Sequence, residues 1–198
     1  HPQFRLVEAD LVDVDLSRLL DGVELIYHLA GQPGVRGSWG SQFEVYVRNN
    51  ILATQRLLEA SLAAGSIPLV YASSSSVYGN RPEMPLQESA APAPISPYGV
   101  TKLAAEHLCR LYNDVYGLPT LSLRLFTVYG PRQRPDMAFR RFLKAAASGR
   151  EIELYGDGTQ TRDFTYVADV VRAFLLAGDK CLARDTAVQV INVAGGTR

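Results

Sequence analysis

Apolar and polar residues follow two different periods along the chain. Residues 24–29 form an almost continuous apolar run of strand length, which is typical of a strand covered on both faces. In residues 44–64, apolar side chains recur every three or four positions, as in a helix with one buried face. Strand-like and helix-like segments continue to alternate, and this alternation predicts an α/β fold with a parallel sheet.

The ends of several elements carry their own signals. Ser96 is a favoured N-cap, Pro97 suits the first helical position, and Gly117 is suited to ending a helix. We therefore expect a helix from Pro97 to about Tyr116. The further strands predicted are 4–7, 68–73, 120–126, 152–154, 164–167 and 188–193, and the further helices are 140–148 and 169–177.

Three loops of small residues follow predicted strands, at 29–31, 72–76 and 126–130. In an open parallel sheet, ligands bind beyond the carboxyl ends of the strands. We therefore expect these three loops to line one crevice.

Composition excludes several classes of function. The 198 residues include 20 basic and 20 acidic side chains, so no charge excess indicates a nucleic acid or membrane partner. Cys109 and Cys181 lack metal-ligand spacing and the three histidines do not cluster, which predicts reduced thiols, a cytoplasmic location and no metal site. We expect His28 and His107 to be packed or surface residues. No apolar run reaches the ~18–20 residues needed to span a bilayer, and the start at His1, without methionine, suggests a fragment.

Tyr98 and Lys102 are four residues apart on the helix predicted to begin at Pro97, so both side chains lie on one face. A tyrosine that acts as a base near pH 7 needs its pKa lowered by about 3 units. One neighbouring cation supplies about 1–3 units, so Lys102 would be helped by a second positive charge such as an oxidised nicotinamide. The alternative is an exposed start of an amphipathic helix.

Four consecutive serines, 73–76, come directly after a predicted strand. Hydroxyl groups at the carboxyl end of a parallel strand are well placed to hydrogen-bond a ligand. The alternative is an ordinary polar loop.

Four motifs together resemble the extended short-chain dehydrogenase/reductase family, in its nucleotide-sugar epimerase/dehydratase branch. They are SSSSVYG at 73–79, SPYGVTK at 96–102, RLFTVYGPRQRPDM at 124–137 and LYGDGTQTRDFTYVADV at 154–170. The resemblance implies a Rossmann-like, doubly wound parallel sheet without its N-terminal part, where the glycine-rich phosphate turn would lie. It assigns 1–135 and 163–180 to a partial NAD-binding domain, and 136–162 and 181–198 to a partial nucleotide-sugar lobe.

The resemblance also implies roles for individual residues. Tyr98 would take the proton from the sugar 4′-hydroxyl, Lys102 would lower the pKa of Tyr98 and bind the nicotinamide ribose, and Ser74 would hydrogen-bond the same hydroxyl. Hydride would pass from C4′ to NAD⁺ and return to the opposite face of a 4-keto sugar. The implied cofactor contacts are Asp10, Leu11, Leu29, Ala30, Gly31, Asn50, Ala72, Tyr98, Lys102 and Phe126. The implied contacts to a UDP-sugar are Arg36, Ser74, Ser75, Ser76, Thr127, Arg134, Met137, Tyr155 and Arg162. A homodimer formed through helices 44–64 and 97–116 is expected.

At two places this chain differs from the motifs of related enzymes, and these differences indicate which reaction to expect. The 4,6-dehydratases carry an Asp-Glu pair, and the decarboxylases a Glu, where this chain has Ser75 and Ser76. Because serine cannot replace a carboxylate acid or base, the resemblance favours plain C4 epimerisation. Thr127 is similar to the residue of uronic-acid epimerases, so we expect conversion of UDP-glucuronate to UDP-galacturonate. The alternatives are a UDP-glucose/UDP-galactose 4-epimerase and a module that binds NAD or a nucleotide sugar without turnover.

Overall fold

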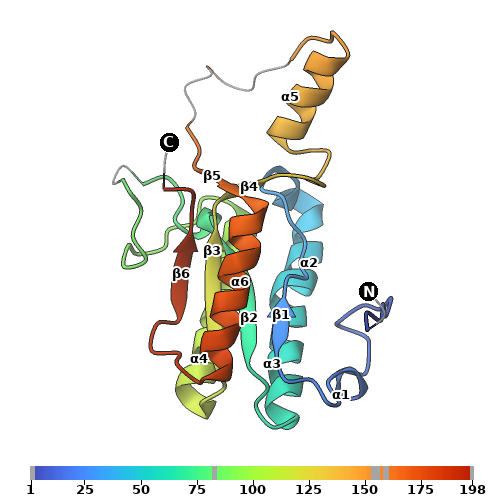
Figure 1. Ribbon diagram of the computed structural model, residues 1–198, viewed down its shortest axis with the longest axis vertical. Helices are drawn as coiled ribbons and strands as arrows, with labels where there is room; N and C mark the ends of the chain where they lie inside the picture. Colours follow the sequence, from blue (N-terminus) through green and yellow to red (C-terminus); the bar gives the residue numbers. More distant parts are fainter. Residues whose placement is uncertain (1–2, 82–83, 153–156, 158–160, 197–198) are drawn as a thin grey trace.

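The computed structural model describes residues 3–81, 84–152, 157 and 161–196. Its centre is a sheet of four parallel strands in the order β1-β2-β3-β6 (Figure 1). The strands are β1 (Ile26–His28), β2 (Leu69–Ser74), β3 (Thr120–Leu125) and β6 (Val190–Val193). The predicted α/β class and parallel sheet are confirmed.

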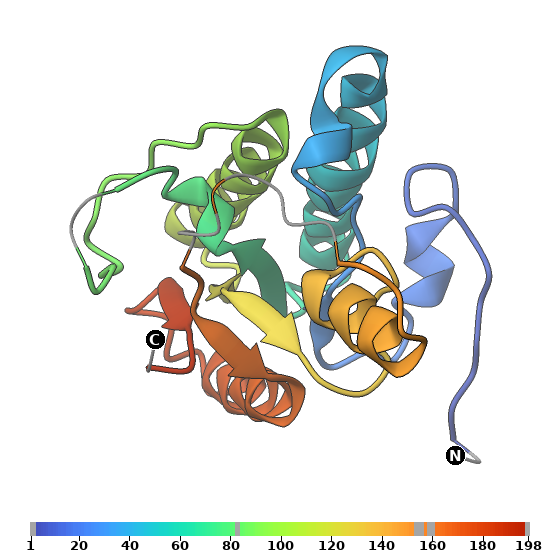
Figure 2. The ribbon, with the colours of Figure 1, turned by 90° about the horizontal axis from the view of Figure 1, so that it is seen from above.

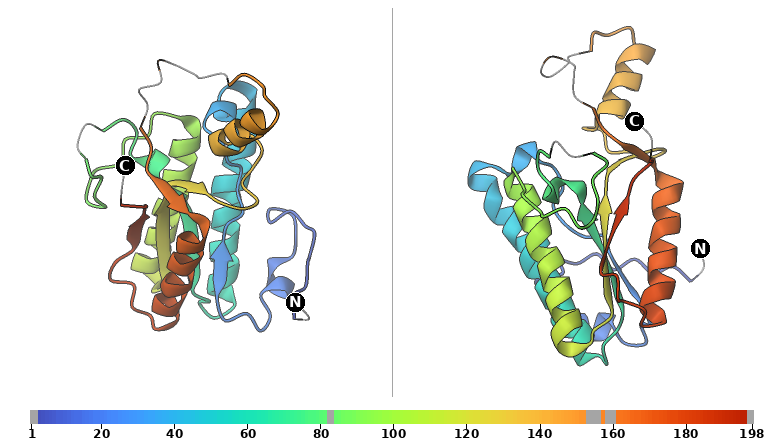
Figure 3. Two further views of the ribbon diagram at one scale, coloured as in Figure 1. Left: turned by 45° about the horizontal axis from the view of Figure 1, so that its top comes forward. Right: turned by 90° about the vertical axis from the view of Figure 1, so that its left-hand side faces the viewer.

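Helices cover both faces of this sheet. One face packs against α3 (Ala53–Ala63) and α4 (Pro97–Tyr116), and the other packs against α6 (Val167–Leu182), as the right-hand view of Figure 3 shows. Alternate residues of each strand face opposite helices because side chains alternate along a strand. Leu69 therefore joins the core under α3 and α4, whereas Val70 joins the core under α6.

All four strands point toward the same edge of the sheet, the upper edge in Figure 1. Loops 29–31, 72–76 and 126–130 begin at or near this carboxyl edge, as predicted. Figure 2 looks onto the edge and shows α4 on one side of the sheet and α6 on the other.

Helix α4 begins and ends where its sequence signals predict. The Ser96 hydroxyl accepts a hydrogen bond from the backbone N–H of Gly99 (3.1 Å), and Pro97 takes the first helical position. Gly117 ends the helix with a φ of +66°, a left-handed conformation that suits glycine.

The helix predicted at 44–64 forms with an irregular middle. It consists of α2 (Phe43–Tyr46), the π-helical η3 (Val47–Leu52) and α3. A π-helical turn holds one more residue than an α-turn and is frequent at functional sites. Here it contains the buried residue Asn50.

Beyond the carboxyl edge lies a second, smaller unit. Strands β4 (Thr127–Tyr129) and β5 (Phe164–Tyr166) pair in parallel, and α5 (Ala138–Ala147) projects away from the main sheet (Figure 1). Strand β4 was not predicted. Nor were the short elements α1 (Leu16–Leu19), η1 (Arg36–Ser38), η2 (Gly40–Gln42) and η4 (Ser75–Val77).

The strand predicted at 4–7 is wrong. Phe4 and Leu6 are 72% and 76% exposed, and this segment joins neither sheet of the described residues. An extended segment is a stable strand only when a neighbouring strand takes up its backbone hydrogen bonds. Strands β1 and β6 are also shorter than predicted, and residues 153 and 154 of the strand predicted at 152–154 lie outside the described part of the chain.

Within the described residues, no helix is long and apolar enough to cross a membrane.

Candidate active site

Lys102 lies one turn after Tyr98 on α4, with its side chain directed into the protein. The residue is 7% exposed, and its ammonium nitrogen lies 4.4 Å from the centre of the Tyr71 ring. Burial lowers the pKa of Lys102 from 10.5 to about 8, although the nearby Cys109 and Glu106 oppose this shift. The ammonium is therefore poised to titrate within a unit or so of neutral pH.

Ser74 and Tyr98 meet at the carboxyl end of β2. Burial raises the pKa of Tyr98, and a hydrogen bond with the Ser74 hydroxyl and the charge of Arg134 lower it, with a net rise. The sequence argument expected Lys102 to lower this pKa. In the structure, burial outweighs the influences that favour the phenolate, and the ammonium of Lys102 lies against Tyr71 instead.

Tyr46 packs against Tyr98. Its ring packs edge-to-face against Tyr98, with ring centres 6.2 Å apart, and its hydroxyl donates to the carbonyl of Gly34 (2.8 Å). No sequence signal separates Tyr46 from the other tyrosines, and it was not predicted.

Asn50 connects the loop after β1 to α4. Its side-chain oxygen accepts from the Gln32 N–H (2.6 Å), and its amide donates to the Gln32 carbonyl (3.1 Å) and to the Thr101 hydroxyl (3.0 Å). A Cβ atom on Gly31 would lie 2.8 Å from the Asn50 oxygen, so glycine permits this close approach. Asn50 therefore positions the loop backbone next to Lys102.

A cavity of about 510 Å³ opens beside this loop. Its volume is within the range of small-molecule sites, roughly 300–1,000 Å³. The residues that line it are Glu8, Ala9, Asp10, Leu11, Ala30, Gly31, Asn49 and Ala53. Four predicted cofactor residues, Asp10, Leu11, Ala30 and Gly31, thus come together at one cavity, whose other lining residues were not predicted.

The remaining predicted cofactor residues lie along the carboxyl edge. Leu29 follows β1 and is 62% exposed, Ala72 is half-buried within β2, and Phe126 follows β3. The backbone N–H of Phe126 donates to the Val193 carbonyl (3.1 Å), which ties this position to β6.

Arg48 is a further residue of this region that the sequence did not indicate. It forms ion pairs with Asp10 (3.2 Å) and Asp13 (2.8 Å), and so fastens the 10–13 segment to η3. A hydrogen bond from the Val12 N–H lowers the pKa of Asp10, as does Arg48.

The residues predicted to bind the substrate lie farther apart than those predicted to bind the cofactor. Arg134 forms an ion pair with Asp136, and its charge acts on Tyr98. Ser75 and Ser76 lie half-buried in η4, and Thr127 opens β4.

The other predicted substrate residues lie farther out or are not described. Met137 precedes α5, and Arg36 is exposed in η1. Arg162 is exposed and donates to its neighbour, the Thr161 carbonyl (2.7 Å). Tyr155 lies outside the described residues.

Three buried charged or titratable residues lie near the site. Glu106 and Arg124 form an ion pair whose side chains are each 4% exposed, and this pair was not predicted, although Glu106 follows Lys102 by the same four-residue step that separates Lys102 from Tyr98. His28 is 2% exposed, and burial, together with the charge of Lys102, lowers its pKa to about 3. His28 is thus packed in the interior, one of the two placements expected for it.

The sequence profile of the NAD dependent epimerase/dehydratase family matches residues 1–194. The chain belongs to this family. It is 45% identical, over 99% of its length, to an uncharacterized UDP-glucose epimerase of Bacillus subtilis (strain 168), of which it covers 61%. It is 39% identical, over 98% of its length, to a UDP-glucuronate 4-epimerase of Thermodesulfobacterium geofontis (strain OPF15), of which it covers 59%.

A solved relative confirms the Rossmann-like fold. The UDP-glucuronic acid 4-epimerase of Bacillus cereus, in complex with UDP-glucuronic acid and NAD, superposes with a TM-score of 0.84 at 45% identity. The match covers 96% of this chain and 59% of that one. The chain thus spans about three fifths of the length of the relatives it matches.

Proposed function

We propose that this chain carries the catalytic group of an NAD-dependent epimerase that inverts C4′ of a UDP-sugar through a 4-keto intermediate. The observation that carries the proposal is the placement of Ser74 beside Tyr98 at the carboxyl edge of the sheet, with the buried Lys102 one helical turn farther along α4. The family to which the chain belongs is NAD dependent, and the relative from B. cereus holds UDP-glucuronic acid and NAD.

Each of the three side chains has a definable task in this reaction. The phenolic oxygen of Tyr98 takes the proton of the sugar 4′-hydroxyl, and Ser74 orients that hydroxyl and stabilises the phenolate. The buried ammonium of Lys102 supplies positive charge next to the loop that Asn50 positions. Bound NAD supplies the acceptor, and later the donor, of the C4′ hydride.

The site fits this cofactor in two respects. The cavity of about 510 Å³ offers room for one end of the cofactor, lined by Asp10, Leu11, Ala30 and Gly31. Gly31, which has no side chain, lets the loop backbone lie against Asn50 at the edge of this cavity. We assign residues 1–135 and 163–180 to the cofactor domain, and residues 136–162 and 181–198 to the sugar-binding lobe.

Ser75 and Ser76 favour epimerisation over elimination. They occupy the turn next to Tyr98 with neutral hydroxyls, where dehydration would require a carboxylate acid or base. Together with Thr127 they can donate hydrogen bonds to a sugar carboxylate. UDP-glucuronate is therefore the preferred substrate in this proposal, and UDP-glucose is the second candidate, because one relative is named a UDP-glucose epimerase.

The experiment compares both UDP-sugars on the complete natural polypeptide that carries this sequence. We expect turnover with UDP-glucuronate, and a fall of about 100-fold or more in kcat for Tyr98→Phe with binding retained. A clear preference for UDP-glucose would overturn the uronate assignment. Undiminished biological function of Tyr98→Phe would instead support a role in binding without turnover.

A further inference from the structure

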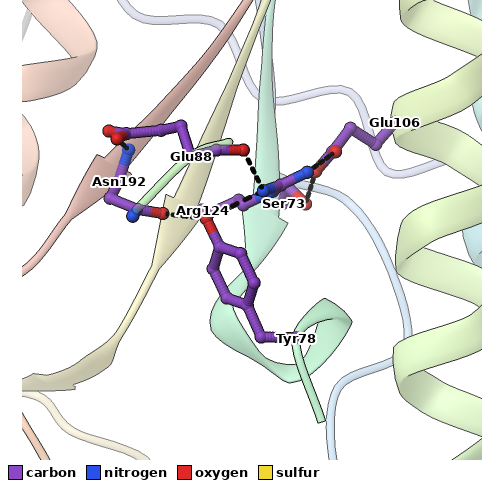
Figure 4. A network of polar contacts seen from close by, with 6 residues as sticks. All are labelled: Ser73, Tyr78, Glu88, Glu106, Arg124 and Asn192. Atoms are coloured by element: carbon purple, nitrogen blue, oxygen red, sulfur yellow. Dashed lines mark hydrogen bonds and ion pairs between the residues drawn. The ribbon is translucent and has the colours of Figure 1, made fainter. Parts of the chain in front are cut away.

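Both flanks of the turn that carries Ser74, Ser75 and Ser76 are attached to one buried ion pair (Figure 4). On the N-terminal side, the Ser73 hydroxyl donates to Glu106 Oε2 (2.7 Å). On the C-terminal side, Arg124 Nη1 donates to the Tyr78 hydroxyl (2.8 Å). Ser74–Val77 is therefore held between two anchors that meet at Glu106 and Arg124.

The ion pair itself has a fixed geometry. Arg124 binds Glu106 in bidentate fashion, with Nε to Oε2 at 3.1 Å and Nη2 to Oε1 at 2.5 Å. A planar guanidinium matches a carboxylate in this arrangement, which a lysine cannot reproduce. The same guanidinium lies 4.7 Å from the centre of the Tyr78 ring, so ring and hydroxyl of Tyr78 are both held.

The outer end of the network is anchored to another strand. The Tyr78 hydroxyl donates to Asn192 Oδ1 (2.7 Å) in β6. The backbone N–H of Asn192 donates to the Glu88 carboxylate (2.8 Å), and its side-chain amide donates to the Leu86 carbonyl (2.9 Å). The hydroxyl of Tyr78 thus both accepts a hydrogen bond, from Arg124, and donates one, to Asn192. The residue is fully buried.

The turn lies directly against the residue that follows the catalytic tyrosine. A Cβ atom on Gly99 would lie 2.6 Å from the Ser76 carbonyl oxygen. Within the turn, the Ser76 N–H donates to the Ser74 hydroxyl (3.1 Å). A shift of the turn would consequently move Ser74 relative to Tyr98.

We propose that Glu106 and Arg124 are positioning residues, which set where the Ser74–Ser76 hydroxyls stand relative to Tyr98. Glu106 lies on the same helix as Tyr98, two turns farther along, so one helix carries the base and also fixes the hydroxyls that serve it. This inference rests on the proposed function for the reaction it serves. The positioning of the turn itself can be measured without activity.

The test removes one anchor at a time in the complete natural polypeptide. Tyr78→Phe deletes the hydroxyl and keeps the ring against Arg124, whereas Ser73→Ala deletes the other anchor. Because a small misplacement in an active site costs about 100-fold, we expect kcat to fall between about 10- and 100-fold in each variant. We expect the NAD content to change by less than about threefold, since no residue of the turn lines the cavity beside the loop after β1.

Thr120→Val is the matched control for lost stability. Thr120 lies on β3, on the same face as Arg124, and its buried hydroxyl donates to the Cys109 carbonyl (2.8 Å) in α4. This variant loses a buried hydrogen bond between the same helix and strand without touching the turn. We expect its kcat to stay within about twofold of the wild type, since no transition-state contact is lost.

Amide hydrogen exchange at residues 75–78 provides the readout that does not depend on turnover. We expect exchange there to accelerate at least about tenfold in Tyr78→Phe and Ser73→Ala, but not in Thr120→Val. Unchanged exchange at the turn, or a loss of kcat equal to that of Thr120→Val, would overturn the positioning role. A wild-type protein inactive on every UDP-sugar would instead overturn the proposed function, and exchange at the turn would still decide whether the ion pair holds it.

Discussion

Burial lowers the pKa of the Lys102 ammonium group, whereas nearby charges raise it. The folded pKa of about 8 lies below the ordinary value of 10.5, so folding disfavours the charged form. The difference corresponds to about 3 kcal/mol, which opposes folding below pH 8 and is relieved as the pH rises from 8 to 10.5. Binding of an anionic or hydroxyl-bearing ligand next to Lys102 would offset part of this penalty.

Titration of Lys102 can be observed directly, because the 198-residue chain contains three lysines. In the chain labelled with [¹³Cε]lysine, we expect one of the three side-chain signals to titrate near pH 8 and to disappear in Lys102→Arg. The measurement is an NMR pH titration. A Lys102 signal that titrates above pH 10 would contradict the burial of the ammonium.

Ser74 is expected to influence the pH at which Tyr98 becomes a base. The hydrogen bond with Ser74 lowers the pKa of Tyr98, so Ser74→Ala should raise that pKa further. In the proposed epimerase, the rising acid limb of kcat/KM against pH would then move to higher pH. Ser74→Thr keeps a hydroxyl and serves as the control. An acid limb that stays in place, or moves to lower pH, would count against the contact.

Between elements, His28 joins the end of β1 to the helix that follows. Its Nε2 lies 2.8 Å from the Thr54 hydroxyl, which donates its own proton to the Asn50 carbonyl (2.7 Å). Nε2 must therefore be the donor, which fixes the tautomer of the neutral imidazole. The contact links the sheet to the π-helical turn that holds Asn50.

Acid should weaken this contact between elements. The pKa of His28 is about 3 in the folded protein, against an ordinary value of 6.5. Because the unfolded chain binds the proton more readily, stability is lost as the pH falls from 6.5 toward 3, by about 1.4 kcal/mol per pH unit. Urea unfolding between pH 4 and 7 measures the slope.

His28→Gln should flatten that slope while retaining a donor for Thr54. The exposed residue His107 provides the control, since His107→Gln leaves the buried contact intact. An equal pH dependence in the wild type and in His28→Gln would show that other groups cause the acid lability.

At the scale of the whole molecule, the outer face of α4 is the surface through which we propose that the homodimer forms. Val100, Leu111 and Val115 are 46%, 51% and 59% exposed, and their spacing places them along one side of the helix. Apolar side chains grouped on one helix face are typical of a surface that another element covers.

Leu111→Glu should therefore shift the protein from dimer to monomer in sedimentation velocity, because a carboxylate would be buried in the interface. Leu176→Glu is the matched control, since Leu176 is 56% exposed on α6, across the sheet from α4. Unchanged sedimentation of Leu111→Glu would exclude this face of α4 from the dimer interface.

Local patterns were sufficient to predict the class of fold, and they supplied the residues proposed for the centre of the site. The periods of apolar residues predicted the parallel α/β arrangement, and Ser96, Pro97 and Gly117 marked the limits of α4. Such signals lie within one or two helical turns of the residues they describe, so they can be interpreted without a structure. Together with the family resemblance, the four-residue step from Tyr98 to Lys102 led to the catalytic pair that we propose.

Contacts between distant segments required the folded structure. Asn50 reaches Thr101 across 51 residues, and Tyr78 reaches Asn192 across 114 residues. The sequence around one partner gives no indication of the other, because only the order of the strands in the sheet brings the two together. For the same reason the apolar segment 4–7 was mistaken for a strand, since a strand depends on a neighbour as much as on its own residues. The residues that perform the proposed chemistry could thus be identified along the chain, whereas the network that holds them in place exists only where the strands and helices meet.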